Sequence, residues 1–310
     1  MNTRSSRVTT FALLCTGTVF ALGAWTVAPK AREPSTAILA AQMQDQCDRM
    51  AGSPFDLGRN PAYAPVGIGE VDATAATACR IAYEATGNPR YAFQLGRALN
   101  KAEQADQAMN AYETAVKADY PAAKVNLGML LGRIGDRDAE FKMYKEAAEA
   151  GNMLAAYNLG VSYRDGIGIT PDATQAIHWF EEAAAHGDMT AAFNIGVIYD
   201  EGNQVTEDNQ MAIAWYDVAA KGGNKDAMIN LGLMYEAGEG IRVNREAAAE
   251  LYAQAAALGD EFGANKLQQL QQAGVHLPEQ APEVSSLPQG FDMLVLAPNE
   301  VELPTTLKDI

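Results

Sequence analysis

A short motif recurs at regular intervals through the middle of the chain and limits the fold to a repeat array. Asn-Leu-Gly, or a close variant of it, ends at Gly96, Gly128, Gly160, Gly196 and Gly232, at spacings of 32, 32, 36 and 36 residues. A second series, Gly151, Gly187, Gly223 and Gly259, recurs every 36 residues, and each member precedes a glycine of the first series, or its equivalent Gln268, by nine residues. Self-similarity at a fixed period of this length is typical of solenoid and other repeat proteins.

Each unit contains two stretches of helical periodicity. In the third unit, Leu159 and Tyr163 are four residues apart, as on one face of a first helix. Apolar residues on one face of a second helix follow at Ala176, Trp179, Phe180, Ala183 and Ala184. The glycine after Leu159 lets the second helix approach closely, and the glycines of the second series fall where a helix C-cap needs positive φ.

These motifs together resemble the Sel1-like repeat, which is related to the tetratricopeptide repeat. The resemblance rests on Leu-Gly-x-x-Tyr, a Gly-rich loop such as Asp165–Ile169, and Ala-x-x-Trp-Phe/Tyr-x-x-Ala-Ala-x-x-Gly. It covers residues 73–274 and implies an all-α protein, a right-handed α-α superhelix (solenoid) of about five helix pairs. The stretch Glu261–Gln272 is expected to cap it, because a terminal repeat would otherwise expose an apolar face.

Two departures from the Sel1-like pattern are visible. The first two units lack four residues between their helices and are similar to shorter tetratricopeptide-like units. In the fourth unit, Asn203-Gln204 replaces Gly-x-Gly, which leaves the conformation of that loop open.

The first 28 residues are predicted to be a signal peptide or signal anchor. Arg4 and Arg7 precede an uncharged stretch from Val8 to Ala28, and small residues favour cleavage after Ala28. An uncleaved stretch of this length could instead span a membrane as an anchor. In both cases the arginines stay on the cytoplasmic side, so we expect a periplasmic or secreted protein, or one anchored in the inner membrane facing the periplasm.

Two further segments flank the array. Residues 29–72 are expected to form an N-terminal helix, from about Ser35 to Met50, and a loop rich in proline and glycine. Residues 275–310 contain several prolines and are expected to form an irregular tail. The one apolar cluster of the tail, Phe291–Ala297, is either a docking strand or a loosely packed flap.

Cys47 and Cys79 remain after removal of a leader that contains Cys15. An even pair in an oxidising compartment predicts a disulfide, and the alternative is two buried, unpaired cysteines. The formal net charge is −16, and it becomes −18 without Arg4 and Arg7, which argues against partners such as nucleic acid or anionic membranes. A membrane contact is expected through an uncleaved N-terminal segment if at all.

The sequence contains no recognisable catalytic constellation. No Gly-x-Ser-x-Gly, Walker-type or dinucleotide motif is present, and His178 and His186 are eight residues apart, whereas ligands on one helix face need a spacing of three or four. His276 lies alone in the tail. We therefore predict no catalytic, cofactor-binding or metal-binding residues, and a protein that is not an enzyme.

What remains is a surface along the first helix of each unit. If these helices line a concave face, as the resemblance implies, residues near each Leu-Gly pair face a groove that fits a helix or an extended peptide. The predicted groove residues are Phe93, Arg97, Met129, Tyr157, Val161, Arg164, Phe193, Val197, Ile229 and Leu233. The alternative is that several of them pack between repeats.

An asparagine ladder accompanies this surface at Asn126, Asn158, Asn194 and Asn230. In related repeats such an Asn can hydrogen-bond a bound peptide, and it can equally tie adjacent helices together. We favour the structural role.

The resulting prediction is an extracytoplasmic scaffold or adaptor that binds a partner protein or peptide in its groove. The resemblance also allows a periplasmic regulator of envelope signalling or exopolysaccharide production. An envelope hydrolase of the β-lactam-binding Cys-rich repeat type is disfavoured, because those relatives carry a Cys pair in each repeat and this chain does not.

Overall fold

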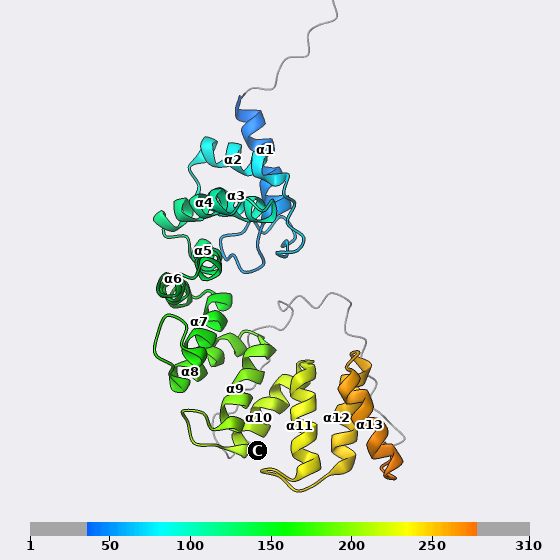
Figure 1. The fold of residues 1–310 in the computed structure, drawn as a ribbon. Helices are drawn as coiled ribbons and strands as arrows, with labels where there is room; N and C mark the ends of the chain where they lie inside the picture. The colour runs from blue at the N-terminus through cyan, green and yellow to red at the C-terminus, as the bar shows by residue number, and fades with distance from the viewer. Residues whose placement is uncertain (1–35, 278–310) are drawn as a thin grey trace, which may run out of the picture.

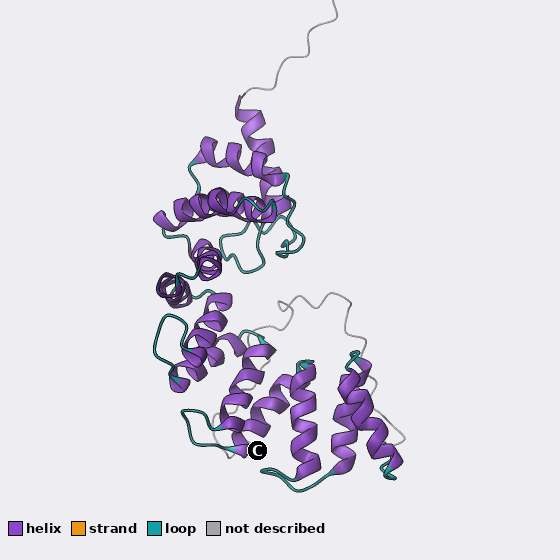
Figure 2. Cartoon of the chain, viewed as in Figure 1, coloured by secondary structure: helices purple, strands orange, loops and turns teal. Residues whose placement is uncertain are grey.

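The computed structural model describes residues 36–277, which form thirteen α-helices and no strand (Figures 1 and 2). The helices are α1 Thr36–Ala51, α2 Ala75–Thr86, α3 Pro89–Lys101, α4 Ala105–Lys117, α5 Pro121–Ile134, α6 Arg137–Glu149, α7 Met153–Asp165, α8 Ala173–Ala184, α9 Met189–Glu201, α10 Asn209–Lys221, α11 Lys225–Ala237, α12 Arg245–Ala257 and α13 Glu261–Gln272. The predicted leader and the apolar cluster Phe291–Ala297 lie outside the described residues.

Each helix packs mainly against its neighbours in the chain, so the molecule is a solenoid. Five pairs, α3–α4 to α11–α12, correspond to the five units of the sequence, and α13 follows them. The predicted all-α solenoid is therefore confirmed. The four residues missing from the short units fall in the connection between helices, which is 102–104 in the first unit and 166–172 in the third.

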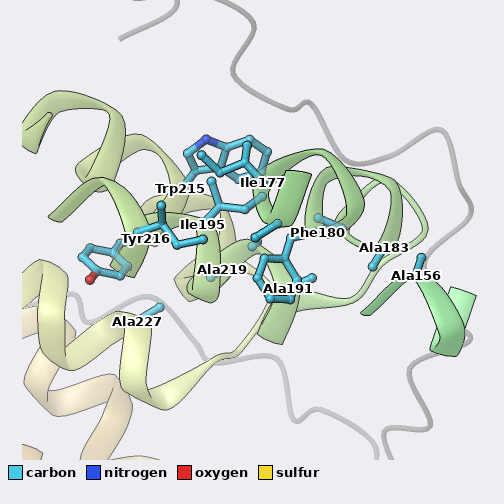
Figure 3. Packing of buried hydrophobic residues seen from close by; sticks show 14 of the residues in the cluster. Ala156, Ile177, Phe180, Ala183, Ala191, Ile195, Trp215, Tyr216, Ala219 and Ala227 are labelled. Carbon is cyan, nitrogen blue, oxygen red and sulfur yellow. The ribbon is translucent and has the colours of Figure 1, made fainter. Parts of the chain in front are cut away.

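The two helices of each unit touch at the glycine of the Asn-Leu-Gly motif. At Gly196 of α9, a Cβ atom would lie 2.6 Å from ring carbon Cδ1 of Tyr216 on α10, closer than van der Waals contact allows. The same contact recurs in the pairs Gly96–Tyr112, Gly128–Tyr144, Gly160–Phe180 and Gly232–Tyr252. Figure 3 shows Phe180, Ile195, Trp215 and Tyr216 among the alanines of this core. Small and aromatic residues thus interlock to a close-packed interior.

Positive φ angles explain the second glycine series. Gly187 ends the turn after α8 with φ 91°, and the equivalent residue after α4 is Asp119, which adopts φ 55°. The loop of the fourth unit also keeps the backbone of its neighbours, because Gln204 (φ 65°) adopts the conformation of Gly168 and Gly240 (φ 68° in both). The departure from Gly-x-Gly therefore leaves the loop conformation unchanged.

A further helix pair precedes the five predicted units. α1 packs against α2 and α3, and a 23-residue segment, 52–74, joins α1 to α2. The predicted Cys47–Cys79 disulfide is present and brings the two Cα atoms to 4.8 Å. α2 ends at Gly87, with φ 64°, nine residues before Gly96, the interval that marks the later units. The repeat pattern therefore extends to α2.

Within residues 36–277, no helix has the length and apolar character needed to cross a membrane.

Candidate partner-binding groove

The predicted groove residues of the first unit are covered by the chain itself. Phe93 and Arg97 of α3 expose 1% and 2% of their surface. The Phe93 ring packs against Tyr112 and Tyr120, and Arg97 bonds to the two ends of residues 52–66, which we call the N-terminal strap. The strap connects to α1 and lies beside α3 (Figure 1). An external partner cannot reach these two side chains while the strap is in place.

Arg97 holds both ends of the strap. Its Nη1 donates to the carbonyl of Ala51 at 2.6 Å, and its Nη2 donates to the carbonyl of Val66 at 2.7 Å. Burial lowers the pKa of the Arg97 guanidinium to about 10, and the charge of Asp56 opposes that shift. Hydrogen bonds from a cation to backbone carbonyls offset part of this burial cost.

The tip of the strap crosses the N-terminal ends of α5 and α7. The Tyr120 hydroxyl lies 2.8 Å and 2.9 Å from the two carboxylate oxygens of Asp56 and donates to this group. Asn152 Nδ2 donates to the carbonyl of Phe55 at 2.9 Å. Burial raises the pKa of Asp56, although the bonds from Tyr120 and the backbone of Gly58 lower it. The strap is thus held against the N-terminal ends of these two helices by one backbone and one carboxylate contact, and its own backbone turns at 54–55, 57–58 and 61–62.

A buried ionic cluster fixes the base of the strap. Asp48 of α1, 3% exposed at its side chain, pairs with Arg90 Nη2 at 3.0 Å. The same carboxylate accepts from Asn60 Nδ2 at 3.0 Å and from Gln94 Nε2 at 3.1 Å. Sequence reasoning missed this cluster, because Asp48 and its partners lie far apart in the chain.

The predicted groove residues beyond the first unit are more exposed than Phe93 and Arg97. Met129 of α5 is 47% exposed and Leu233 of α11 is 37% exposed. Apolar residues between them are partly buried and pack against the core, at Tyr157, Val161, Phe193, Val197 and Ile229. We call the surface from Met129 to Leu233 the open groove.

The two aromatic residues of the open groove also support the core. The Tyr157 ring lies 5.8 Å from the Phe180 ring, and the Phe193 ring lies 5.7 Å from the Tyr216 ring. Tyr157 and Phe193 therefore pack against the core and are also partly exposed on the groove side of the solenoid. Truncating either residue would change the stability of the fold as well as any binding. Leu233 is the sharper probe of the surface.

Two members of the asparagine ladder join consecutive units. Asn126 Nδ2 donates to the Tyr112 hydroxyl at 3.3 Å, and Asn230 Nδ2 donates to the Tyr216 hydroxyl at 3.1 Å. The tyrosine in each case is the ring that packs on the glycine of the preceding unit. These two asparagines have a structural role.

The other two members, Asn158 and Asn194, do not bond to a tyrosine of the preceding unit. Phe180 has no hydroxyl, and Asn194 instead accepts from Arg164 Nη1 at 2.6 Å and donates to the carbonyl of Thr190 at 3.0 Å. Arg164 is thereby tied to α9 rather than standing free at the groove edge. Within residues 36–277, the side chain of Asn158 makes no hydrogen bond.

The histidines do not form a site together. His178 is exposed beside Trp179, and exposed His186 lies 2.8 Å from the carbonyl of Glu182 through its Nδ1. His276 is exposed after α13. In the part of the chain that the structure describes, no three His, Cys, Asp or Glu residues cluster as metal ligands would.

The family model for the Sel1 repeat matches residues 121–152, 154–188, 190–224 and 225–260. Four consecutive units of this chain are Sel1 repeats. The matches begin at α5, so the second unit, which we likened to a shorter tetratricopeptide-like unit, fits the Sel1 model, and α3–α4 lie outside the matched residues.

Solved structures agree with this family. A protective antigen of uropathogenic Escherichia coli strains, described as displaying an SLR fold, is 25% identical with a TM-score of 0.62. That match covers 68% of this chain and 48% of the antigen, so the chain spans about half the length of that protein. A Sel1 repeat protein from Oxalobacter formigenes is 26% identical with a TM-score of 0.53, over 61% of this chain and 88% of that one. No curated protein sequence matches the chain.

Sel1 and tetratricopeptide-like repeats are generally protein–protein interaction scaffolds.

Proposed function

We propose that this protein is an extracytoplasmic scaffold or adaptor that binds a partner protein or peptide in the open groove. The observation that carries the proposal is the rise in side-chain exposure from the first predicted groove residues to the later ones. The first unit is filled by the strap, with Phe93 buried, and the stripe is exposed at Met129 and Leu233. Partly exposed apolar side chains along successive helices are what a helix or an extended peptide needs for docking.

The contacts of the strap support a peptide as the class of partner. Asn152 binds a backbone carbonyl and Tyr120 binds a carboxylate, so the N-terminal ends of α7 and α5 already hold backbone and acidic groups of a non-helical segment. The N-cap Asn224 of α11 stands where Asn152 stands in the third unit, and its Oδ1 accepts from Ala227 N as the Oδ1 of Asn152 accepts from Ala155 N. We propose that Asn224 gives a partner's backbone the same type of contact.

An extracytoplasmic location is part of the proposal. It is supported by the Cys47–Cys79 disulfide, since such bonds persist in oxidising compartments. Non-reducing mass spectrometry of protein taken from its native envelope, after rapid alkylation of free thiols, tests the point. Alkylated Cys47 and Cys79 would contradict it.

A binding experiment tests the role of the groove. The variant Leu233→Glu places a charge on the open groove, and Leu258→Glu is its control, because Leu258 is equally exposed at 37% but lies at the C-cap of α12, on the second helix of the unit. A partner captured by cross-linking to the wild-type protein is then titrated against both variants. We expect Leu233→Glu to weaken binding by about 1 kcal/mol or more, roughly fivefold in affinity.

The control decides how the result is interpreted. Equal affinity of Leu233→Glu and the wild-type protein would exclude the open groove as the binding site. Equal losses in both variants would point to a general effect of added negative charge.

A further inference from the structure

The last turns of the first helices change charge along the solenoid. Three of these helices, α3, α5 and α7, carry a cation there, at Lys101, Arg133 and Arg164. The last turn of α9 contains no basic residue and carries Asp200 and Glu201 instead. Because the carbonyl end of a helix bears a partial negative charge, the cations stabilise their helices and the two carboxylates destabilise α9. Helix stability alone therefore does not account for the acidic end of α9.

Both carboxylates lie at the edge of the open groove. Asp200 and Glu201 follow the groove residue Val197 by three and four positions, so they continue the same face of α9. Asp200 is partly exposed and Glu201 is exposed. Asp200 Oδ2 accepts from the Tyr216 hydroxyl at 3.0 Å, and within residues 36–277 neither carboxylate forms an ion pair. A partner in the groove can therefore contact both charges.

The neighbouring cation of α7 is bonded elsewhere. The negative charge of Glu201 acts on Arg164, but the Nη1 of this guanidinium donates to Asn194 and its Nε pairs with Asp165 at 2.7 Å. One cation thus stands beside three carboxylates where α7 and α9 end, and the local charge stays negative.

The next unit boundary shows how such a carboxylate binds a cation. Glu236 holds the position in α11 that Asp200 holds in α9, and its Oε2 pairs with Lys266 Nζ at 2.6 Å. The Tyr252 hydroxyl donates to the same oxygen at 3.0 Å, which repeats the phenol–carboxylate contact of Asp200. In the α9 unit, the residue equivalent to Lys266 is the neutral Asn230. The boundary between α9 and α11 therefore has the carboxylate and the phenol of this arrangement but not its ammonium group.

We propose that the open groove binds a segment of a partner protein in which a lysine or arginine lies beside apolar residues. This partner class rests on the scaffold function proposed above. The apolar side chains contact Val197 and Leu233, and the cation binds Asp200 and Glu201. The bound cation offsets the unfavourable charge in the last turn of α9, and the formal net charge of −16 attracts a basic segment from a longer distance.

Peptide display against the full chain tests the proposal before any natural partner is known. Random peptides are selected on the wild-type protein, and the tightest binder is synthesised and titrated against variants. We expect this peptide to carry lysine or arginine beside apolar residues. Asp200→Asn combined with Glu201→Gln should weaken its affinity about fivefold or more, since one exposed ion pair contributes up to about that factor. The amide oxygen of Asn still accepts from the Tyr216 hydroxyl, so the fold is retained.

A matched control separates the site from the overall charge. Glu181→Gln combined with Glu182→Gln removes two adjacent carboxylates from α8, the second helix of its unit, and changes the net charge equally. This variant should bind the peptide as the wild-type protein does. Leu233→Gln should weaken binding, and Leu258→Gln, at a residue of equal exposure, should not.

The outcomes distinguish this proposal from the scaffold function. If Leu233→Gln weakens binding but the Asp200 and Glu201 variant does not, the groove binds peptides and the assignment of a basic partner is wrong. Equal losses in that variant and the α8 control would also overturn the assignment, because they attribute binding to net charge. If no peptide is selected, or if Leu233→Gln has no effect, the scaffold function in the open groove fails together with it.

Discussion

Replacing Arg97 with Met should release the strap and lower the free energy of unfolding by about 2–4 kcal/mol. The two bonds from Arg97, at 2.6 Å and 2.7 Å to the carbonyls of Ala51 and Val66, are both to a charged donor. Such bonds contribute about 1.5–3 kcal/mol each, which gives roughly 3–6 kcal/mol before any offset. Removing the guanidinium also removes the cost of burying it, which is visible in its pKa of about 10, so the net loss is smaller.

Lys101 provides a matched control on the same helix. It lies one turn after Arg97, and its Nζ donates to the carbonyl of Gly69 at 2.9 Å, but its side chain is exposed. A cation in water adds little to such a contact, so Lys101→Met should cost about 0.5 kcal/mol or less. Both cations donate to a backbone carbonyl, so the larger loss expected for Arg97→Met comes from the burial of the Arg97 side chain.

Urea denaturation measures the free energies, and limited chymotrypsin digestion follows the strap. In Arg97→Met, cleavage after Phe55 or Leu57 should accelerate about tenfold or more relative to the control, because local opening sets the rate. The reasoning would be refuted if both variants lost the same free energy, or if Arg97→Met unfolded more easily with no change in cleavage at these residues.

Three further predictions concern the repeats, the disulfide and the cap. Gly196→Ala should destabilise by about 1–3 kcal/mol despite the better helix propensity of Ala, because its Cβ would meet the Tyr216 ring; a higher melting temperature would contradict this. Cys47→Ser should cost about 3–4 kcal/mol in urea denaturation, for a bond across 32 residues, and an unchanged midpoint would argue against it. Burial raises the pKa of Glu236, but hydrogen bonds from Lys266 and a tyrosine bring it below the usual 4.5. Because the folded pKa is lowered, this stabilisation is present above pH 4.5 and is lost as pH falls through the folded value. The expected result is lower protection factors of α13 amides below about pH 4, each relative to the unfolded-chain exchange rate at the same pH, with no such change in Glu236→Gln.

Local periodicity was sufficient to predict the repeating part of the fold. A glycine in one helix and a ring sixteen or twenty residues later form one contact, as Gly96 does with Tyr112 and Gly196 with Tyr216. Every unit makes this contact between its own two helices. A pattern that is local in the sequence therefore predicts how the helices pack. Gly87 belongs to the same series, and its nine-residue interval to Gly96 was the available signal for the extra pair α1–α2.

The covered part of the groove was harder to predict, because it depends on contacts between distant residues. Phe93 and Arg97 have the position and residue types of groove residues, and periodicity alone places them on the inner face. Arg97 is buried where Ala51 and Val66 accept its hydrogen bonds, and neither residue lies in the five units that the periodicity predicts. The sequence feature that distinguished the first unit was the cation Arg97 directly after the motif glycine, where the later units carry the apolar residues Met129, Val161, Val197 and Leu233.

The four asparagines of the ladder differ in the hydrogen bonds that their side chains make. Asn126 and Asn230 donate to tyrosine hydroxyls of the preceding unit, and Asn194 is held by Arg164 where Phe180 provides no hydroxyl. A side chain that already donates within the solenoid would have to break that bond to donate to a partner, at a cost of about 1 kcal/mol or more. Asn158 carries no such cost, since its side chain has no hydrogen bond within residues 36–277. Asn158 follows Tyr157 directly, so an amide without a hydrogen bond in the described residues and an aromatic residue of the open groove are adjacent in the third unit. A partner that makes both apolar and polar contacts would therefore use this unit most.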